Sequence, residues 1–422
     1  MKPISVYLEI VRRVHYIIFS DYYIRRATYR QMDFTRTRKM SFTDYIFAII
    51  GNTKNSLQAG INAFLDTHKT GQMEYSKQAF SKGRQRIKPE AFEELFRATV
   101  DTFYEKTCGS KWRDYHILGI DGTRLNLPCT KELRELYGEQ TSQGASQVQA
   151  LVSCIYDLLD GMIVDVCLAG CTSNERDAAK QMIEAYDAKR ISNPVFVMDR
   201  GYPSAELIDT VLRAGHKFLM RCSTEFLRKM DLPEQDNVLE HKFSKLRYPV
   251  KIRVVKVPLD NGTTEYLITN LFETDISVED FRYLYNLRWG IETKYNDVKN
   301  KLEIENFTGY SPVAVQQDFY ATLFLANLEG ALEYDLHDEI EAAHRKPENK
   351  YEYHMNTNLA ISEMKQHVVE MVMTTSAIKK ARLFRKIQNR LMKAVVPVRP
   401  DRSNPREKKH NAAKFSQNTK RP

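Results

Sequence analysis

The sequence lacks any hydrophobic run long enough to cross a membrane. No apolar segment of its 422 residues approaches the roughly 20 residues that span a bilayer. The N-terminal stretch, residues 1–19, carries charged side chains among its apolar ones, unlike the continuous apolar core of a secretory signal. We therefore expect a protein that has no membrane partner and stays in the cytoplasm.

Cysteine is also scarce, and its spacing does not suit a metal site. Of the six cysteines, only Cys167 and Cys171 lie close together, and no pair of histidines follows them at zinc-finger spacing. A zinc site is therefore not expected. Four of the six lie in apolar stretches, which predicts buried free thiols.

Acidic residues are nearly absent from the C-terminal tail. Residues 376–422 hold fifteen Lys and Arg against only Asp401 and Glu407, a local charge of +13 in a chain whose net charge is +9. Residues 1–40 form a second basic region, with nine Lys and Arg against three acids. Basic segments at both ends predict a polyanionic partner, most simply nucleic acid. For the tail alone, a solubilising role remains open.

The N-terminal region, residues 1–110, is predicted to be mostly helical. Apolar residues recur at helical spacing in 41–52 and 56–68, with Ser41 and Ser56 as caps, and Pro89 begins a further helix. The segment before Pro89 is basic and includes Lys77, Lys82, Arg84, Arg86 and Lys88. These helices suit either docking on DNA in helix-turn-helix fashion or a plain helical bundle.

From residue 111 the pattern changes to short apolar segments alternating with helices. Asp160-Gly161 predicts a hairpin turn, and Asn174 and Gly215 bound two predicted helices. The expected order is a strand and turn (115–128), a hairpin (148–170), a helix (174–189), a strand ending at Asp199, a helix (204–216) and a strand (217–223). This order describes an α/β protein with a mixed sheet covered by helices.

Residues 226–275 alternate as antiparallel strands do, with Asn261-Gly262 as a turn, and predict a β-rich insertion. A long helix is expected from about Val278 to Leu302, and more helix over 313–335 and 358–394. The predicted domains are a helical DNA-binding region (1–110), a catalytic domain (111–335), a C-terminal helical region (336–395) and a basic, disordered tail (396–422).

Two carboxylates stand where predicted strands end. Asp121 follows the apolar run HILGI, and Asp199 follows VFVM. Ligands of α/β sheets gather beyond strand ends, which makes both residues catalytic candidates. Asp-Gly and Asp-Arg-Gly are also ordinary turn sequences, so this alternative remains open for each residue taken singly.

The helix expected from Val278 carries a third acid within a polar stripe. Tyr285, Arg288, Glu292 and Lys299 share an arc of about 60° at helical periodicity. A solvated face with an Arg–Glu pair four residues apart is the alternative. The flanking residues are largely apolar, which favours a packed helix and therefore a functional site: Tyr283, Leu284, Leu287, Trp289 and Ile291.

Three carboxylates that converge from two strand ends and one helix suit a pair of divalent cations. Hard oxygen ligands favour Mg²⁺, with Mn²⁺ as a substitute. Two such ions can serve an in-line displacement at phosphorus. Asp121, Asp199 and Glu292 are therefore candidates for both catalysis and metal binding.

The stripe also resembles a known family motif. The spacing Y-x-x-R-x-x-x-E-x-x-x-x-x-x-K of Tyr285, Arg288, Glu292 and Lys299 is similar to the Y-R-E-K signature of DDE transposases of the insertion sequence 4 family. The surroundings are similar too, in ILGIDGTRLNLP, NER, VMDRGYPS and LEIENFTGYSP. The resemblance covers about residues 75–335 and identifies a bacterial insertion-sequence transposase.

This resemblance implies an RNase H-like core with a β-rich insertion before the final acid. It implies an enzyme that binds terminal inverted repeats and cuts and joins double-stranded DNA at transposon ends and target. Asp121, Asp199 and Glu292 would hold two Mg²⁺ ions. A homodimer is expected because two ends must be paired.

The resemblance further implies DNA contacts by Tyr285, Arg288 and Lys299. Trp289 is a candidate aromatic for a flipped base, with a core position as its alternative. Arg124 and Arg200, near the acids, are candidate DNA contacts or structural arginines.

Two other functions are compatible with an RNase H-like protein of this kind. One is a DNA-binding relic without catalysis, against which the presence of all three acids argues. The other is an RNase H-like nuclease without strand transfer, against which the helical N-terminal region and basic tail argue.

Overall fold

The computed structural model describes residues 5–36, 38–52, 56–69, 74–142, 145–187, 190–228, 230–260, 262–345 and 351–398. Its contacts divide the chain into two compact units. The first comprises Met1–Lys106, Asn126–Val148 and Asp297–Pro422, and the second comprises Thr107–Leu125 and Gln149–Asn296. Each unit is therefore assembled from segments that are distant in sequence.

The first unit is mainly helical, as predicted for its N-terminal part. Ser41 and Ser56 cap their helices as expected, each accepting a hydrogen bond from a backbone N–H of the first turn. The helices are α1 (Val6–Ile18), α2 (Asp21–Ala27), α3 (Phe42–Ile50), α4 (Leu57–His68), α5 (Lys77–Arg84), α6 (Glu90–Thr107), α7 (Lys131–Tyr137), α12 (Pro312–His344), α13 (Thr357–Met373) and α14 (Ala377–Leu391).

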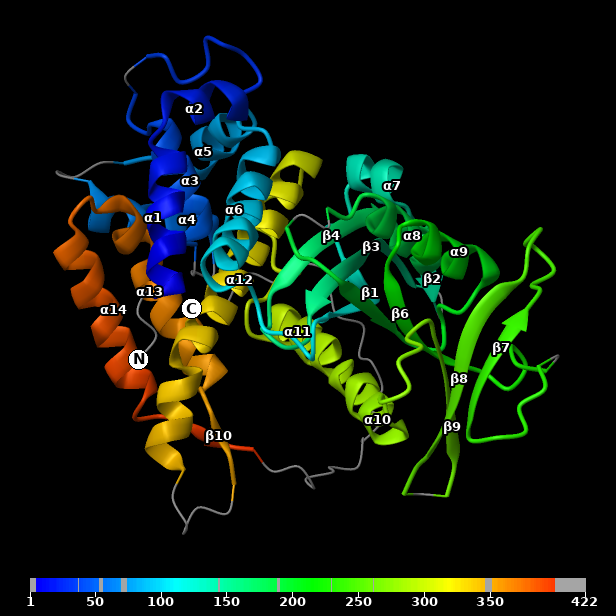
Figure 1. The fold of residues 1–422 in the computed structure, drawn as a ribbon. Helices are drawn as coiled ribbons and strands as arrows, with labels where there is room; N and C mark the ends of the chain where they lie inside the picture. The colour runs from blue at the N-terminus through cyan, green and yellow to red at the C-terminus, as the bar shows by residue number, and fades with distance from the viewer. Residues whose placement is uncertain are drawn as a thin grey trace. The chain divides into compact units, whose positions relative to one another are not determined.

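Helix α12 forms the centre of this unit. It packs against α1, α3 and α13 (Figure 1). Its buried residues lie on every side of the helix, as expected of a helix inside a bundle. The sequence-based boundaries end the catalytic domain at 335, whereas residues 297–335 group with the N-terminal helices because α12 packs among them.

Arg84, one of the cations of the basic segment before Pro89, is buried in the structure. Its side chain is 1% exposed and forms an ion pair with Asp318 at 2.8 Å. The same guanidinium donates to Gln317 Oε1 and Thr308 Oγ1. The partners come from residues more than 200 positions away, so the sequence around Arg84 could not reveal them.

The second unit contains most of one mixed sheet. Its strand order is β2-β3-β1-β5-β6-β9-β8-β7, with β4 paired to β3. Helices α8 and α9 pack against each other, α8 against β4 and α9 against β6. β2 (Glu139–Ser142) belongs to the first unit. The other strands of the sheet and the helices that follow them in the chain are β1 (His116–Asn126), β3 (Ala145–Asp157), β4 (Ile163–Gly170), α8 (Glu175–Glu184), β5 (Pro194–Met198), α9 (Ala205–Arg213), β6 (Lys217–Cys222), β7 (Asp236–His241), β8 (Val250–Pro258), β9 (Thr264–Thr269), α10 (Val278–Leu287) and α11 (Trp289–Asn300).

Two local predictions in this unit fare differently. The hairpin at Asp160-Gly161 is confirmed, with Gly161 at a φ of +72° between β3 and β4. The turn expected after Asp121 is wrong, because β1 continues through it to Asn126. β1 pairs with β3 on one side and β5 on the other, and this pairing satisfies its backbone and overrides the local turn preference of Asp-Gly.

The three strands predicted as a β-rich insertion extend the main sheet. β9 pairs antiparallel with β6, and β8 and β7 follow outward. Asn261 of the predicted turn lies outside the described residues, whereas Gly262 has a φ of +79°. The segment therefore continues the same sheet.

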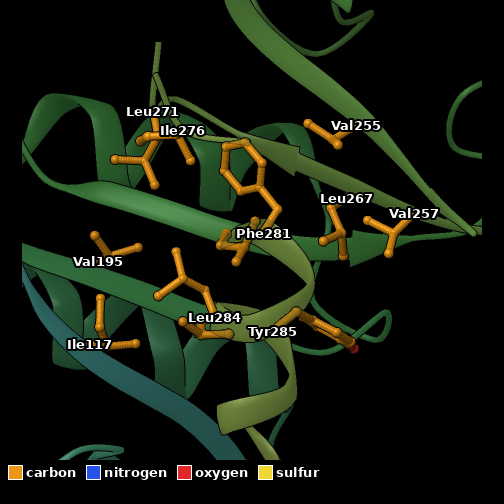
Figure 2. Close-up of a cluster of buried hydrophobic side chains, with 12 residues drawn as sticks. Ile117, Val195, Val255, Val257, Leu267, Leu271, Ile276, Phe281, Leu284 and Tyr285 are labelled. Carbon is orange, nitrogen blue, oxygen red and sulfur yellow. The ribbon is translucent and has the colours of Figure 1, made fainter. Parts of the chain in front are cut away.

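Helix α10 lies on this sheet through an apolar cluster. Phe281, Leu284 and Tyr285 of α10 pack among side chains of β1, β5, β8 and β9 (Figure 2). The single helix expected from Val278 to Leu302 is interrupted at Arg288, where α10 ends and α11 begins. Of the cysteines, Cys154, Cys171 and Cys222 are buried, and Cys108 and Cys129 are exposed.

A second, small sheet pairs β10 (Tyr353–His354) with β11 (Val396–Pro397) in the first unit. The predicted disordered tail lies outside the described residues from 399 onward. Within the described part of the chain, no helix is both long and apolar enough to cross a bilayer.

Candidate active site

Asp121 lies on β1, and Asp199 directly follows β5, the parallel strand beside it. The last paired residues of these two strands are Gly119 and Val197. Asp121 and Asp199 each come two residues after this pair, and adjacent strands lie about 4.8 Å apart. The two acids are therefore close enough for the charge of Asp199 to act on Asp121.

The electrostatics of Asp121 reflect this placement. Its pKa is raised from 3.8 to about 6, first by burial and further by the charges of Asp199 and Glu175. Two contacts oppose this shift and lower the pKa of Asp121. The Gly122 N–H donates to Asp121 Oδ1 at 2.9 Å, and the positive charge of Arg288 favours the ionised carboxylate. Asp121 is thus a partly buried acid on which two other carboxylates and one arginine act.

Arg288 connects the helical part of the site to the strand ends. Its Nη1 donates to Glu292 Oε1 at 2.8 Å, while its charge also acts on Asp121. The guanidinium lies over the rings of Tyr285 at 5.6 Å and Trp289 at 5.2 Å. Arg288 is 7% exposed and lies at the break between α10 and α11. Of the predicted polar stripe, Tyr285 and Glu292 therefore contact this buried arginine.

The surroundings of Asp121 contain three residues to which sequence reasoning assigned no role. Glu175 opens α8 directly after its cap Asn174, and a Cβ on Gly122 would lie 2.8 Å from the Glu175 carboxyl carbon. Tyr295 donates its hydroxyl to the carbonyl of Asp121 at 2.7 Å. The hydroxyl of Tyr202 is buried and has no hydrogen-bond partner in the described residues.

A signal for one of these residues was available. Glu175 lies in the Asn174-Glu175-Arg176 segment, and Arg176 Nε donates to the carbonyl of Gly201, two residues after Asp199. Polar residues at the start of a helix that faces strand ends are candidates for a site. The positions of Tyr202 and Tyr295 follow only from the tertiary fold.

The remaining predicted residues take varied positions. Tyr285 is 4% exposed and belongs to the apolar cluster, whereas Trp289 is 53% exposed and so does not lie in the core. Lys299 is half-buried on α11. Arg200 is exposed beside Asp199, and Arg124 donates to the carbonyl of Cys171, which ties it to the fold.

The donor set suits a divalent cation in its chemistry. Asp121, Asp199, Glu175 and Glu292 offer hard carboxylate oxygens. A cation would offset both the burial and the repulsion by Asp199 and Glu175 that raise the pKa of Asp121. In the described residues, no group of three or more His, Cys, Asp or Glu side chains is close enough to ligate one ion. Glu292 is bound to Arg288, so this pair would open for Glu292 to serve as a ligand.

Comparison with known proteins identifies the family. The family model described as "Transposase DDE domain" matches residues 112–328, slightly more than half of the 422 residues. No curated protein matches the sequence. The cryo-EM structure of a piggyBac transposase synaptic complex with hairpin DNA is similar over 90% of this chain and 85% of its own, at 10% identity and a TM-score of 0.48. The chain belongs to the family of transposases with a DDE domain, which cut DNA and transfer its strands.

Proposed function

We propose that the chain is the transposase of a bacterial insertion sequence of the insertion sequence 4 family. It binds the terminal inverted repeats of its element, cuts there and joins the ends to target DNA. An RNase H-like catalytic core, a homodimer that pairs the two ends and a place in the cytoplasm on the nucleoid belong to the same proposal.

One observation carries the proposal. Asp121 lies on β1 and Asp199 directly follows the adjacent parallel strand β5, and the charges of Asp199 and Arg288 both act on Asp121. Arg288 is also bound to Glu292. A partly buried acid with a raised pKa, near other acids and a basic residue, is typical of functional sites. The gathering of Asp199 and Glu175 near Asp121 favours such a site over a structural ion pair.

The roles of the chain's own residues follow from their positions. Asp121, Asp199 and Glu292 would hold two Mg²⁺ ions, for which Mn²⁺ could substitute. When bound, these cations supply Lewis acidity at the reacting phosphate. Arg288 releases Glu292 for this role and turns its charge toward the DNA phosphate. Tyr285 holds Arg288 in place through its ring.

Further residues would contact DNA around these acids. Lys299 and Arg200 bind phosphates, and exposed Trp289 stacks on an unpaired base. Arg124 shapes the site through the Cys171 carbonyl and reaches DNA only if this bond opens.

The test is cleavage and joining of DNA that carries the element's ends. With Mg²⁺, purified full-length chain should cut at the ends and yield joined products. Asp199→Ala should lower the cleavage rate by at least about a hundredfold, equivalent to about 2.7 kcal/mol, while binding of the ends is retained. Asp260→Asn is the matched control, because Asp260 is an acid whose side chain is 89% exposed and pairs with Arg282.

The outcomes separate the alternatives. End binding without any cutting by the unmodified chain would indicate a DNA-binding relic. Cutting without joined products would indicate a nuclease. Near-normal cleavage by Asp199→Ala would remove Asp199 from the site.

A further inference from the structure

Helix α14 has one face packed in the first unit and one face in solvent. The packed face contacts α13 and α1, and the Phe384 ring stacks on Tyr7 at 5.6 Å. The buried residues of this face are Lys380, Phe384, Ile387 and Leu391. The apolar side of α14 is therefore already used within the fold.

The solvent face is basic, and three of its cations have no acidic partner among the described residues. α14 has six Lys and Arg and no acid. Lys379 pairs with Glu370 at 3.0 Å, and Arg390 pairs with Glu363 at 2.6 Å, both acids on α13. Arg382, Arg385 and Lys386 are exposed and make no hydrogen bond or ion pair within the described part of the chain.

These three cations line one groove of the protein surface. Ile378, Ala381 and Asn389 complete its lining together with Arg390, and its volume is about 600 Å³. Arg382 and Lys386 are one helical turn apart, and Arg385 lies between them. The groove thus presents positive charge along successive turns with one further polar side chain.

We propose that this face of α14, defined by Arg382, Arg385, Lys386 and Asn389, docks on the phosphate backbone of duplex DNA. Duplex DNA carries one negative charge per about 1.7 Å of its axis, so each helical turn of about 5.4 Å meets several phosphates. Contacts to phosphate position a protein and read no sequence. The surface therefore grips DNA of any sequence, beyond the recognition of the element's ends.

The chemistry of the face favours DNA over other polyanionic partners. A membrane-bound helix inserts an apolar face, but that face of α14 is packed against α13 and α1. An acidic protein surface is the other partner class. The chain belongs to a family that acts on DNA, and a row of flexible cations suits a regular polyanion better than an irregular protein surface.

The experiment measures binding of full-length chain to a duplex without transposon ends, in chelator and over a range of salt concentrations. A triple variant in which Gln replaces Arg382, Arg385 and Lys386 should have a shallower slope of log affinity against log salt concentration. Its magnitude should fall by about 2–3. The matched control is Lys131→Gln/Arg228→Gln/Arg345→Gln, which removes the same charge from side chains that are 87%, 76% and 82% exposed. The control should change the slope by less than about 1.

Arg382→Lys/Arg385→Lys keeps the charges and should keep the slope, which separates the charge effect from any damage to the fold. Equal slopes for the triple variant and its control would overturn the proposal. If the triple variant lost its binding to polyglutamate but retained its binding to DNA, the proposal would be overturned in favour of an acidic protein partner. Asp199→Ala should keep the full slope, so failure of the proposed cleavage chemistry and failure of this surface are distinguishable.

Discussion

Asp121 is held between opposing electrostatic influences. Burial and the charges of Asp199 and Glu175 raise its pKa, whereas the Gly122 N–H and Arg288 lower it. The balance leaves a folded-state pKa of about 6, well above the ordinary value of 3.8. The fold therefore disfavours the ionised Asp121 carboxylate, which is the form that a cation would require. Functional sites commonly reduce the stability of the fold in this way.

The raised pKa has a consequence for stability that can be measured. Because the folded state binds this proton more tightly than the unfolded state, stability falls as pH rises from about 4 to about 6 and stays lower above it. Asp121→Asn cannot ionise, so without metal it should be more stable than the unmodified chain at pH 8 by about 1–3 kcal/mol. Thermal unfolding in chelator at a series of pH values measures the difference.

The advantage of Asp121→Asn should shrink as the pH approaches 4. Asp260→Asn, at an exposed acid, should show no such trend. Adding Mg²⁺ should raise the unfolding temperature of the unmodified chain more than that of Asp121→Asn. An advantage that does not change with pH would show that Asp121 does not titrate near 6.

At the scale of helices and strands, local signals predicted what depends on local chemistry. The caps Ser41, Ser56 and Asn174 were predictable because a cap binds the N–H groups of its own first turn. The apolar runs before Asp121 and Asp199 also predicted the strands that lead to these acids, although only β5 ends at its acid. Their alignment was not, because it depends on the register between β1 and β5.

Predictions failed where distant residues decide the outcome. The Asp121-Gly122 turn gave way to a strand through pairing in the sheet. Arg84 looks like a surface cation because its neighbours in sequence are basic. Its acceptors lie on and just before α12, which only the folded chain brings near.

The buried Arg84–Asp318 pair joins α5 to α12. Arg84→Met should destabilise the first unit by about 3–5 kcal/mol, because it leaves a buried carboxylate without its partner. Asp318 also accepts from the Thr308 N–H at 2.6 Å, which Asn at this position can preserve. Arg84→Met/Asp318→Asn should therefore cost less than Arg84→Met alone. Urea unfolding of both variants measures these costs.

Lys82→Met is the control on the same helix. Lys82 is exposed, so its replacement should change stability by less than about 0.5 kcal/mol. If Arg84→Met costs no more than Lys82→Met, the ion pair does not hold α5 on α12.

At the scale of the whole molecule, the two compact units do not follow the chain as consecutive domains. The chain leaves the first unit near Lys106, returns for Asn126–Val148 and returns again from Asp297. A change from helical to strand patterning locates the first boundary. The later boundaries cannot be recognised from composition. The apolar residues of α12, for example, would suit a buried helix in either unit.

We therefore expect that a segment containing α12 folds only together with the other helices of the first unit. α12 buries large apolar side chains, including Val315, Phe319, Leu323, Phe324, Leu325, Leu328, Leu332, Leu336 and Ile340. Much of this surface packs on α1, α3 and α13. Each such side chain contributes about 1.5–3 kcal/mol when buried, so their exposure together exceeds the usual net stability of about 5–15 kcal/mol.

We expect the isolated segment 111–335 to aggregate or to bind the dye ANS as a partly folded chain. Residues 5–398 should stay soluble and unfold cooperatively. Size-exclusion chromatography, ANS fluorescence and calorimetry compare the two. Cooperative unfolding of segment 111–335 without ANS binding would mean that the apolar surface of α12 can be buried without the helices of the first unit. In that case the consecutive boundaries suggested by the sequence would describe folding better than the contacts of the folded chain do.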